Sequence, residues 1–563
     1  MTYRRTQIRG TFRWLFALTA SISSVVAFGT DLQAAGSSSG QLHAESALVT
    51  PSAIELSGAV VGSVRVNAGN IFDLESPEEN KALFRVANKL HVITRGDVIN
   101  QQLLFSPGDA FSVQSMEESE RILRSNRYLQ DAFVRPVAVN NGVVDVEVTT
   151  TDVWTLVPKL SLSRSGGANK GSIGIKEMNL LGSGIAMELA YKSDVDRDSS
   201  SLKYLDRNVG HSWYSLGFYL ADNSDGHTAE VVLDRPFYSL DSRSSRGFLF
   251  SDNDQVDSFY DLGERKSEYR HEAARAEAKM GWSKGLANGY SRRWTAGLTQ
   301  DEHKFSNFDN SEYANGVLPE NRKLIYPFVG LEIIEDRFEK TQNLNQIGRT
   351  EDRFLGTRLT ARMGFAAEGF GSDRDALVLA ATAETGFGTS RRSSLLLSSG
   401  LSARVEQSGV RNLSLSGSAK YFKRQSDKRL LYVGLSGSFG KDLDLDQLTM
   451  MGGDSGLRGY PLRYQTGDKQ ALLTVEQRYF TDWYPFRLFR VGGAVFFDVG
   501  KVWGDTPVAT TEAGLLRDVG FGLRIGNNRS GLGRMTHIDV AIPLDGDNSI
   551  DNVQFLISTR KSF

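Results

Sequence analysis

One arginine stands inside a glycine-rich decapeptide, Met451 to Tyr460, and it is the residue with the clearest chemistry in this chain. Four of these ten residues are glycine, which adopts positive φ angles and close backbone approaches at little cost, so the segment forms a loop. About forty residues after Arg458, the segment 496–500 is typical of a strand that carries one carboxylate, Asp498. Together with a terminal aromatic, Phe563, these features suggest a closed β-barrel with a loop folded into it.

The elements that would position these residues are strands. From about Leu156 onward, apolar and polar residues alternate, and in 489–500 one face is apolar while the other mixes charge with glycine. A soluble sandwich also alternates, but its strands are usually shorter and its charged face meets water outside. The final segment ends on an aromatic that the barrel-insertion machinery would read. The residues that share its apolar face are Phe555, Ile557 and Phe563.

The rest of the chain supports a membrane barrel made of strands. After the N-terminal segment no apolar run reaches 18 residues, so no membrane helix is expected. Residues 156–563 are therefore predicted to form a transmembrane antiparallel β-barrel in a mainly β protein. The pattern allows 16 to 20 strands; 16 strands leave about 25 residues for each strand and its loops, which is normal for such barrels.

The N-terminal segment, residues 1–35, resembles an export signal. Four arginines precede a short apolar stretch, and cleavage is expected either after Ala27 or near Ala34-Ala35; the alternative is a basic tail without structure. Residues 36–58 are rich in Ser, Ala and Gly and are predicted to be a linker. Helical and strand periods follow in 59–155, including a capping box from Ser115 to Glu118, and predict a small α/β domain.

Composition excludes several classes of protein. The chain has no cysteine, which removes disulfide scaffolds and thiolate metal sites. The net charge of −2 gives no reason to expect a nucleic-acid partner. The histidines lack ligand spacing and no phosphate-binding motif is present, so neither a metal nor a cofactor is expected. The segment Gly453-Asp454-Ser455-Gly456 copies the surroundings of a trypsin-like nucleophile, but no histidine stands in a partner motif, so no catalytic residue and no enzyme is expected.

These residues together resemble the outer-membrane assembly and translocation superfamily typified by BamA and TamA. The loop, folded inward over residues 446–467, and the barrel wall each carry a motif of that superfamily, and five strands after the loop match its count, which favours 16 in all. The loop residues are Leu457, Arg458, Gly459 and Tyr460, and the wall residues are Phe496, Asp498 and Gly500.

Residues 59–155 resemble a single polypeptide-transport-associated (POTRA) domain, the periplasmic module of this superfamily, as in its surface-antigen branch with one module. The major assembly factors carry several modules, so a central role in biogenesis does not follow. An arginine in a barrel lumen needs a carboxylate or water. The resemblance implies Asp498 as the partner of Arg458; the other acids expected on the lumen face are Glu476, Asp518 and Asp539.

The resemblance implies a Gram-negative outer-membrane barrel that assists insertion, assembly or translocation of other polypeptides. Its partners would be client outer-membrane or secreted proteins, outer-membrane lipid, and a periplasmic protein bound through the POTRA-like domain. The alternative is a passive channel or surface receptor without assembly activity. A two-partner secretion pore usually carries two modules and a plug helix, and one module is expected here. The client and the opening of a seam between first and last strands are not visible in the sequence.

Overall fold

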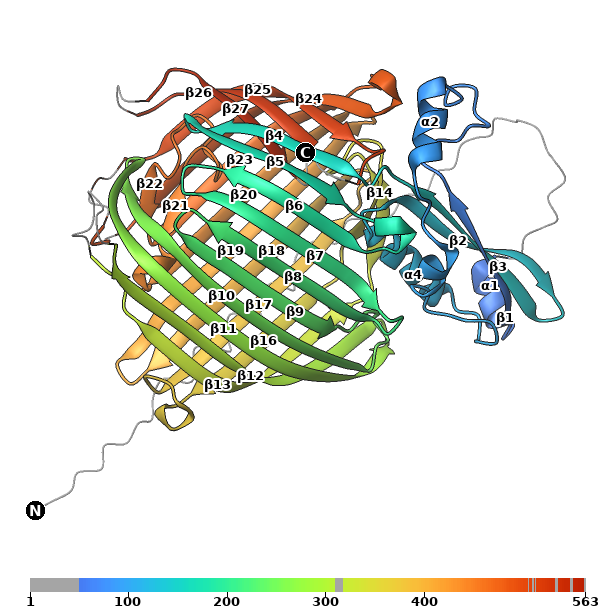
Figure 1. Ribbon diagram of the computed structural model, residues 1–563, viewed down its shortest axis with the longest axis horizontal. Helices are drawn as coiled ribbons and strands as arrows, with labels where there is room; N and C mark the ends of the chain where they lie inside the picture. The colour runs from blue at the N-terminus through green and yellow to red at the C-terminus, as the bar shows by residue number, and fades with distance from the viewer. Residues whose placement is uncertain are drawn as a thin grey trace, which may run out of the picture. The chain divides into compact units, whose positions relative to one another are not determined.

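The computed structural model describes residues 50–308, 317–504, 506–508, 511, 513–531, 535–546 and 550–560. The predicted signal peptide, most of the predicted linker and Phe563 lie outside the described residues. From Pro51 onward the chain forms one compact unit, in which an N-terminal α/β region, residues 51–155, is followed by a large barrel (Figure 1). None of the described helices is long and apolar enough to cross a membrane.

The N-terminal α/β region is a three-stranded sheet with short helices. Strand β3 lies in the middle, parallel to β1 and antiparallel to β2. Asn141 and Gly142 join β2 to β3 with φ angles of 51° and 78°, as expected for an Asn-Gly hairpin turn. The elements are α1 (Pro51–Leu56), β1 (Val60–Gly69), α2 (Ala82–Leu90), α3 (Gly96–Asn100), α4 (Val113–Ser125), β2 (Leu129–Asn140) and β3 (Val143–Asp152).

Helix α4 begins earlier than the predicted capping box. Its N-cap is Ser112, whose side chain accepts a hydrogen bond from the Ser115 amide at 3.4 Å. Ser115 therefore lies within the first turn, and the Glu118 carboxylate accepts from the Leu240 amide of the barrel at 2.8 Å. The earlier start points Met116 and Leu123 into the core of the region, where both are buried.

Twenty strands, counted over the described residues, close into one antiparallel barrel. They are β4 (Val157–Ser165), β5 (Ala168–Glu177), β6 (Ala186–Ser193), β7 (Asp198–Val209), β8 (Tyr214–Asn223), β9 (Gly226–Arg235), β10 (Ser244–Asp261), β11 (Glu264–Ala287), β12 (Tyr290–Asn307), β13 (Arg322–Glu335), β16 (Arg358–Ala366), β17 (Ala376–Gly388), β18 (Ser393–Glu406), β19 (Gly409–Ser426), β20 (Arg429–Lys441), β23 (Lys469–Phe480), β24 (Phe489–Trp503), β25 (Leu516–Asn527), β26 (Met535–Pro543) and β27 (Gln554–Arg560).

The favoured number of 16 strands was therefore wrong, although five barrel strands do follow the inward-folded loop. The reason is the length of the links. Two residues join β10 to β11, and two join β11 to β12. With links this short, one strand and its loop take about 20 residues rather than about 25. The segment 156–563 therefore has room for more than 16 strands.

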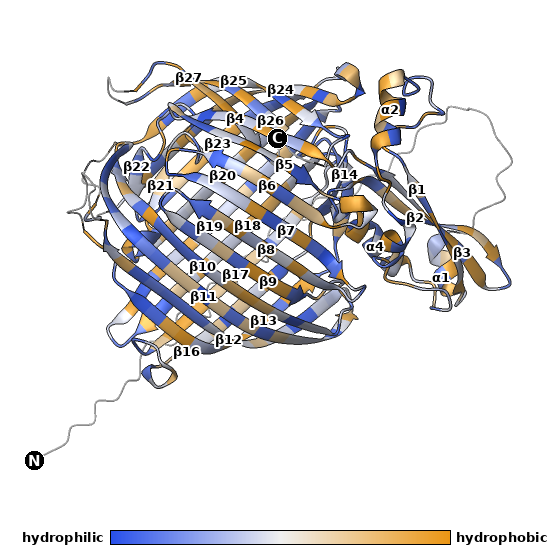
Figure 2. Cartoon of the chain, viewed as in Figure 1, coloured by the Kyte–Doolittle hydropathy of each residue, from blue (hydrophilic) through white to orange (hydrophobic). Residues whose placement is uncertain are grey.

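The charged face of the strands points into the barrel. Arg362 of β16 pairs with Glu277 of β11 at 2.9 Å, although β12 and β13 lie between these strands. Side chains of strands that are not neighbours meet only across the interior, so this face lines the lumen. The opposite face carries exposed apolar side chains such as Leu160 and Phe521. Figure 2 shows the alternation as orange and blue bands along the strands. A closed barrel with such an outer face satisfies its backbone internally and suits a bilayer.

The links of the barrel fall at two ends. The near end is the one where the N-terminal α/β region enters; its link around η1 (Leu180–Gly182) accepts a hydrogen bond from the Arg95 amide. The far end carries the last residue of β12, the first residue of β13 and the link 442–468. Smaller elements lie in the links: β14 (Phe338–Gln342), β15 (Thr350–Phe354), η2 (Glu368–Phe370), η3 (Leu445–Gln447), β21 (Thr449–Met451), β22 (Gln465–Gly467) and η4 (Pro485–Arg487).

The barrel closes weakly between its first and last strands. Strand β27 pairs with β26 over seven register positions, from Met535↔Arg560 to Ala541↔Gln554. Against β4 it has a single register pair among the described residues, Ile557↔Arg164. We call this β27–β4 junction the seam. Over residues 157–165 and 554–560, the seam therefore has no continuous ladder of the kind that joins the other neighbouring strands of the barrel.

Candidate functional site

The inward-folded loop connects β20 to β23 at the far end and packs against the lumen face of β23–β25. Glycines permit its path. Gly456 has a φ of 127°, and a Cβ atom there would collide with the Leu472 side chain. At Gly459, a Cβ would lie 2.7 Å from the Asp518 Cβ and 3.1 Å from the Pro543 nitrogen. The glycines let the loop backbone press directly on the wall, which brings Arg458 to the wall acids.

Arg458 and Asp498 form a two-pronged ion pair in the lumen. The guanidinium donates from Nε to Asp498 Oδ2 at 2.6 Å and from Nη2 to Oδ1 at 3.0 Å. The side chains are 4% and 0% exposed, respectively. The Arg458 Cζ also lies 3.3 Å from the centre of the Phe496 ring, a cation–π contact. A buried, bidentate pair of this kind fixes both position and orientation of the loop.

A second carboxylate completes the environment of Arg458. Its Nη1 donates to Glu476 Oε1 at 2.8 Å, and the other oxygen of Glu476 accepts from Arg478 Nε at 3.0 Å. Arg524 donates to Asp539 and lies 3.8 Å from Glu476. Three guanidinium groups and three carboxylates are thus interleaved. The members of this lumen charge cluster are Arg458, Arg478, Arg524, Glu476, Asp498 and Asp539.

The other candidate partners of Arg458 have different roles. Asp518 accepts the backbone N–H of Gly459 at 3.1 Å, so it holds the loop main chain. Asp539 approaches Arg458 Nη1 only to 4.0 Å and pairs mainly with Arg524. Arg478 and Arg524 were not among the site residues expected from the sequence. Both follow the alternation of the lumen face, on which Glu476 and Asp539 lie, and that register was the available signal.

Tyr460 and Leu457 anchor the loop beside the arginine. The Tyr460 hydroxyl donates to the Arg517 carbonyl at 2.7 Å and lies 3.2 Å from the Asp545 carbonyl. Both residues are fully buried in one apolar cluster with Val502. Tyr460 thereby joins the loop to the far-end link between β26 and β27.

The wall motif is shaped to receive the loop. A Cβ at Gly500 would lie 2.7 Å from the Met451 Sδ and 3.3 Å from Leu457 Cδ2, so a side chain there would displace the loop. Phe496 is the register partner of Gly520 on the neighbouring strand. The Phe496 ring fits there because Gly520 has no side chain, and a Cβ at Gly520 would collide with the ring. The glycine and aromatic of the wall motif are therefore steric requirements of the same contact that pairs Arg458 with Asp498.

The remaining predicted residues lie elsewhere. Phe555 and Ile557 are exposed on the outer face of β27, and Phe563 is outside the described residues. Ser455 Oγ accepts from the Gly452 amide at 2.8 Å, within its own turn, and Asp454 pairs with Lys170 at 3.4 Å. Neither contact provides the acid and base that a serine nucleophile needs.

A hairpin from the near end also enters the lumen, which the sequence did not indicate. Strands β14 and β15 form it, and its tip residues Leu344 and Ile347 are 1% and 5% exposed against lumen-facing side chains such as Phe422. The Leu344 carbonyl accepts from Arg478 Nη1 at 3.2 Å. This near-end hairpin, residues 336–357, therefore contacts the lumen charge cluster from the side opposite to the loop.

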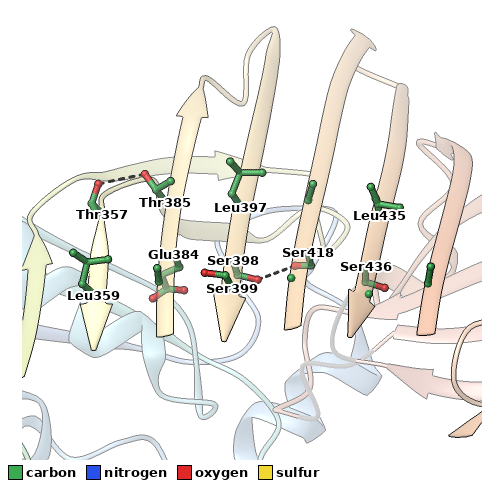
Figure 3. Close-up of a pocket in the computed structure, with 15 residues that line it drawn as sticks. Thr357, Leu359, Glu384, Thr385, Leu397, Ser398, Ser399, Ser418, Leu435 and Ser436 are labelled. Atoms are coloured by element: carbon green, nitrogen blue, oxygen red, sulfur yellow. Dashed lines mark hydrogen bonds between the residues drawn. The ribbon is translucent and has the colours of Figure 1, made fainter. Parts of the chain in front are cut away.

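A hollow of about 700 Å³ lies in the wall of strands β16–β20, away from the lumen charge cluster (Figure 3). Its labelled outward leucines include Leu359 and Leu397, and Ser398 and Ser418 form a hydrogen bond at 2.8 Å between neighbouring strands. Leucines, small residues and one carboxylate, Glu384, are among the residues that line this hollow.

Fold and site together define a class: a closed antiparallel barrel with a loop locked in its lumen by a buried ion pair. No protein-family model and no curated protein matches the chain. Among solved structures it is similar to BamA from Haemophilus ducreyi lacking POTRA domains 1–3, with 13% identity, a TM-score of 0.36, and coverage of 89% of this chain and 84% of that one.

It is also similar to CdiB from Acinetobacter baumannii, with 13% identity, a TM-score of 0.42 and coverage of 89% and 74%, and to CdiB from Escherichia coli, with 14% identity, a TM-score of 0.47 and coverage of 90% and 77%. At these identities and TM-scores the similarity concerns the fold, and conclusions about function depend on the residues.

Proposed function

We propose that this chain assists the insertion, assembly or translocation of other polypeptides at the outer membrane of a Gram-negative cell. Its barrel would span the membrane, and the N-terminal α/β region would act in the periplasm as a POTRA-like module. The observation that carries the proposal is the seam. Strand edges with unpaired N–H and C=O groups are templates for another strand, and the described parts of β4 and β27 would offer two such edges beside lipid.

The lumen charge cluster supports this assignment, because it makes the wall beside the seam rigid. The Arg458–Asp498 pair fastens the loop to β24, and Asp518 and Tyr460 extend the attachment to β25 and the β26–β27 link. The strands that approach the seam from the C-terminal side are thereby held as a block. Opening would then be confined to the single-pair junction.

The N-terminal sheet supplies a further edge. Glu120 and Arg124 of α4 bind the backbone of the first half of β2, through the Val134 amide and the Ala132 carbonyl. The second half of β2 exposes Val137 and Val139. We infer that an extended client strand, or a strand of a periplasmic partner, adds to this part of the edge by β-augmentation. The driving force would be the client's own folding and burial in lipid, with no cofactor.

The test locks the seam chemically. Cysteines at Arg164 and Ile557, the register partners across the seam, can be oxidised in a chain that has no other cysteine. A matched control places cysteines at Ile173 and Tyr191, register partners between β5 and β6. We expect the oxidised seam pair to change the outer-membrane proteome as strongly as deletion of the protein does, and the control pair to leave it unchanged.

An unchanged profile of barrels, secreted proteins and lipoproteins after deletion would reject the assembly proposal. The passive channel is the competing function, and it predicts conductance in a planar bilayer. The loop and the near-end hairpin both occupy the lumen, so we expect low conductance in the unmodified protein.

A further inference from the structure

A cluster of two histidines and an aspartate lies in the lumen at the far end, apart from the lumen charge cluster. His271 belongs to β11 and His303 to β12, and the register pairs Ala273 with His303. The two histidines are therefore diagonal neighbours on one face of the sheet. Asp446 comes from η3, at the root of the inward-folded loop. One ring nitrogen of each histidine and one Asp446 oxygen lie within 4.8 Å of one another.

The outer nitrogen of each ring is held by its own carboxylate. His271 Nδ1 lies 2.8 Å from Asp257 Oδ2, and His303 Nε2 lies 3.4 Å from Asp301 Oδ1. A carboxylate at this position accepts an N–H and orients the ring. Metal-binding histidines nearly always have such a partner, because it fixes the tautomer that leaves the other nitrogen free to bind.

The inner nitrogens of the two rings face each other. His271 Nε2 and His303 Nδ1 are 2.9 Å apart. A neutral imidazole has one N–H, and a ring that donates it to its carboxylate leaves a lone pair on the inner nitrogen. With both rings in that tautomer, the two inner lone pairs face each other at short range and repel unless a cation lies between them. Two nitrogens bound to one ion at about 2.1 Å would be about 3–3.4 Å apart, close to the distance observed.

The surroundings are suited to holding an ion away from bulk water. The His271 and Asp446 side chains are 11% and 3% exposed. Phe305 stacks on His271, with ring centres 4.5 Å apart. Arg322 donates to both Asp446 oxygens, at 2.8 and 2.6 Å, and fixes the carboxylate. A carboxylate offers about four lone-pair positions, so these oxygens retain capacity for another bond.

We propose that His271, His303 and Asp446 bind one divalent transition-metal ion of the Zn²⁺ or Cu²⁺ class. Two imidazoles select such ions over Mg²⁺ and Ca²⁺, which prefer oxygen ligands. A shared proton would engage only the two nitrogens, whereas a metal ion engages all three donors. Because Asp446 belongs to the loop and the histidines to the wall, the ion joins the root of the inward-folded loop to strands β11 and β12.

This proposal departs from the expectation that the chain binds no metal. His271 and His303 are far apart in the sequence and show no ligand motif. They meet because two adjacent strands run antiparallel with a two-residue link, Asn288-Gly289. The register of a hairpin is set by its turn and its buried face, and it was not visible as a spacing of histidines.

The test is a binding titration on the full-length folded barrel in detergent, stripped of metal with a chelator. We expect one equivalent of Zn²⁺ by calorimetry, and Cu²⁺ to give an electron paramagnetic resonance spectrum with coupling to two nitrogens. The double variant His271→Asn/His303→Asn should lose both signals. Asp257→Asn, which removes only the orienting carboxylate, should weaken Zn²⁺ binding about 10–100-fold.

His227→Asn is the matched control, since His227 is an exposed histidine on the outer face of β9 and is paired with Asp252 at 3.2 Å. It should bind Zn²⁺ like the unmodified protein. Far-UV circular dichroism and heat-dependent gel mobility establish that each variant is a folded barrel. Absence of stoichiometric Zn²⁺ binding in the unmodified protein, or equal binding in the folded double variant, would overturn the proposal.

Discussion

Two segments enter the lumen from opposite ends, and their charges are partnered differently. The inward-folded loop directs Arg458 to Glu476 and Asp498, which both belong to the barrel wall. The near-end hairpin directs Asp352 to Arg124 of the N-terminal α/β region, with two hydrogen bonds of 2.7 Å. The loop is thus part of the barrel, whereas the hairpin is shared between the barrel and the N-terminal region.

This difference indicates which segment would follow a movement of the N-terminal region. Asp352 is 16% exposed, while Asp498 is fully buried. The hairpin is also held by Thr350 Oγ1, which donates to Asp131 at 2.7 Å, and by Arg349, which donates to the Leu129 carbonyl at 2.9 Å. A movement of the N-terminal region would therefore displace the hairpin and leave the loop in place.

The largest expected effect is that of Arg458→Ala. It leaves Asp498 and Glu476 buried without their cation, and breaking such a pair costs about 3–5 kcal/mol. We expect a barrel that inserts but unfolds at a lower urea concentration in lipid vesicles. Arg463→Ala is the control, because Arg463 lies in the same loop and pairs with the partly exposed Asp196; it should cost at most about 1 kcal/mol. Equal stabilities of the two variants would contradict a locked loop.

Arg124→Ala should have the next largest effect and should act at the other end. It removes the charged hydrogen bonds to Asp352 and Glu120, each worth about 1.5–3 kcal/mol, part of which is regained by solvation. We expect the near-end hairpin to loosen and the conductance in a planar bilayer to rise. Arg135→Ala, at an exposed position of β2, should leave conductance unchanged. An unchanged conductance of the Arg124→Ala variant would show that the barrel alone holds the near-end hairpin.

Tyr460→Phe should weaken the attachment of the inward-folded loop without changing any charge. The hydroxyl contacts the Arg517 and Asp545 carbonyls, which lose a donor. The expected loss in free energy of unfolding is about 1–2 kcal/mol. Tyr479→Phe, at an exposed position of β23, is the control and should have no measurable effect. A loss as large as that of Arg458→Ala would mean that the hydroxyl, not the ion pair, holds the loop.

The smallest effect concerns pH and the N-terminal region. Burial raises the pKa of the Glu118 carboxyl above its ordinary value of 4.5. The folded state then binds the proton of the Glu118 carboxyl more tightly than the unfolded state does. The protonated carboxyl therefore contributes fully to stability below pH 4.5, and this contribution is lost as pH rises through the raised pKa. We expect Glu118→Gln to flatten the fall of stability over that window, measured by urea unfolding at several pH values. Glu117→Gln, on the exposed side of α4, should keep the slope.

The sequence predicted local structure well and global closure poorly. Alternation in 489–500 and the Asn-Gly turn of the N-terminal sheet became β24 and the β2–β3 hairpin, because both depend on near neighbours in the chain. The strand number did not follow, since closure depends on every link and register at once. The near-end hairpin was missed because β14 and β15 are only five residues long each.

At the candidate site, residue types were visible in the pattern, whereas the one expected partner of Arg458, Asp498, was implied by the resemblance alone. The sequence by itself determined that Arg458 lies in a glycine-rich loop and that acids recur on one face of the last strands. Only the tertiary structure decided that Asp498 receives two of its hydrogen bonds, that Asp518 holds the Gly459 backbone, and that Arg478 continues the contacts to the hairpin. The physical reason is that periodicity assigns a side chain to a face, whereas its partner across a lumen is set by the curvature and register of the closed barrel.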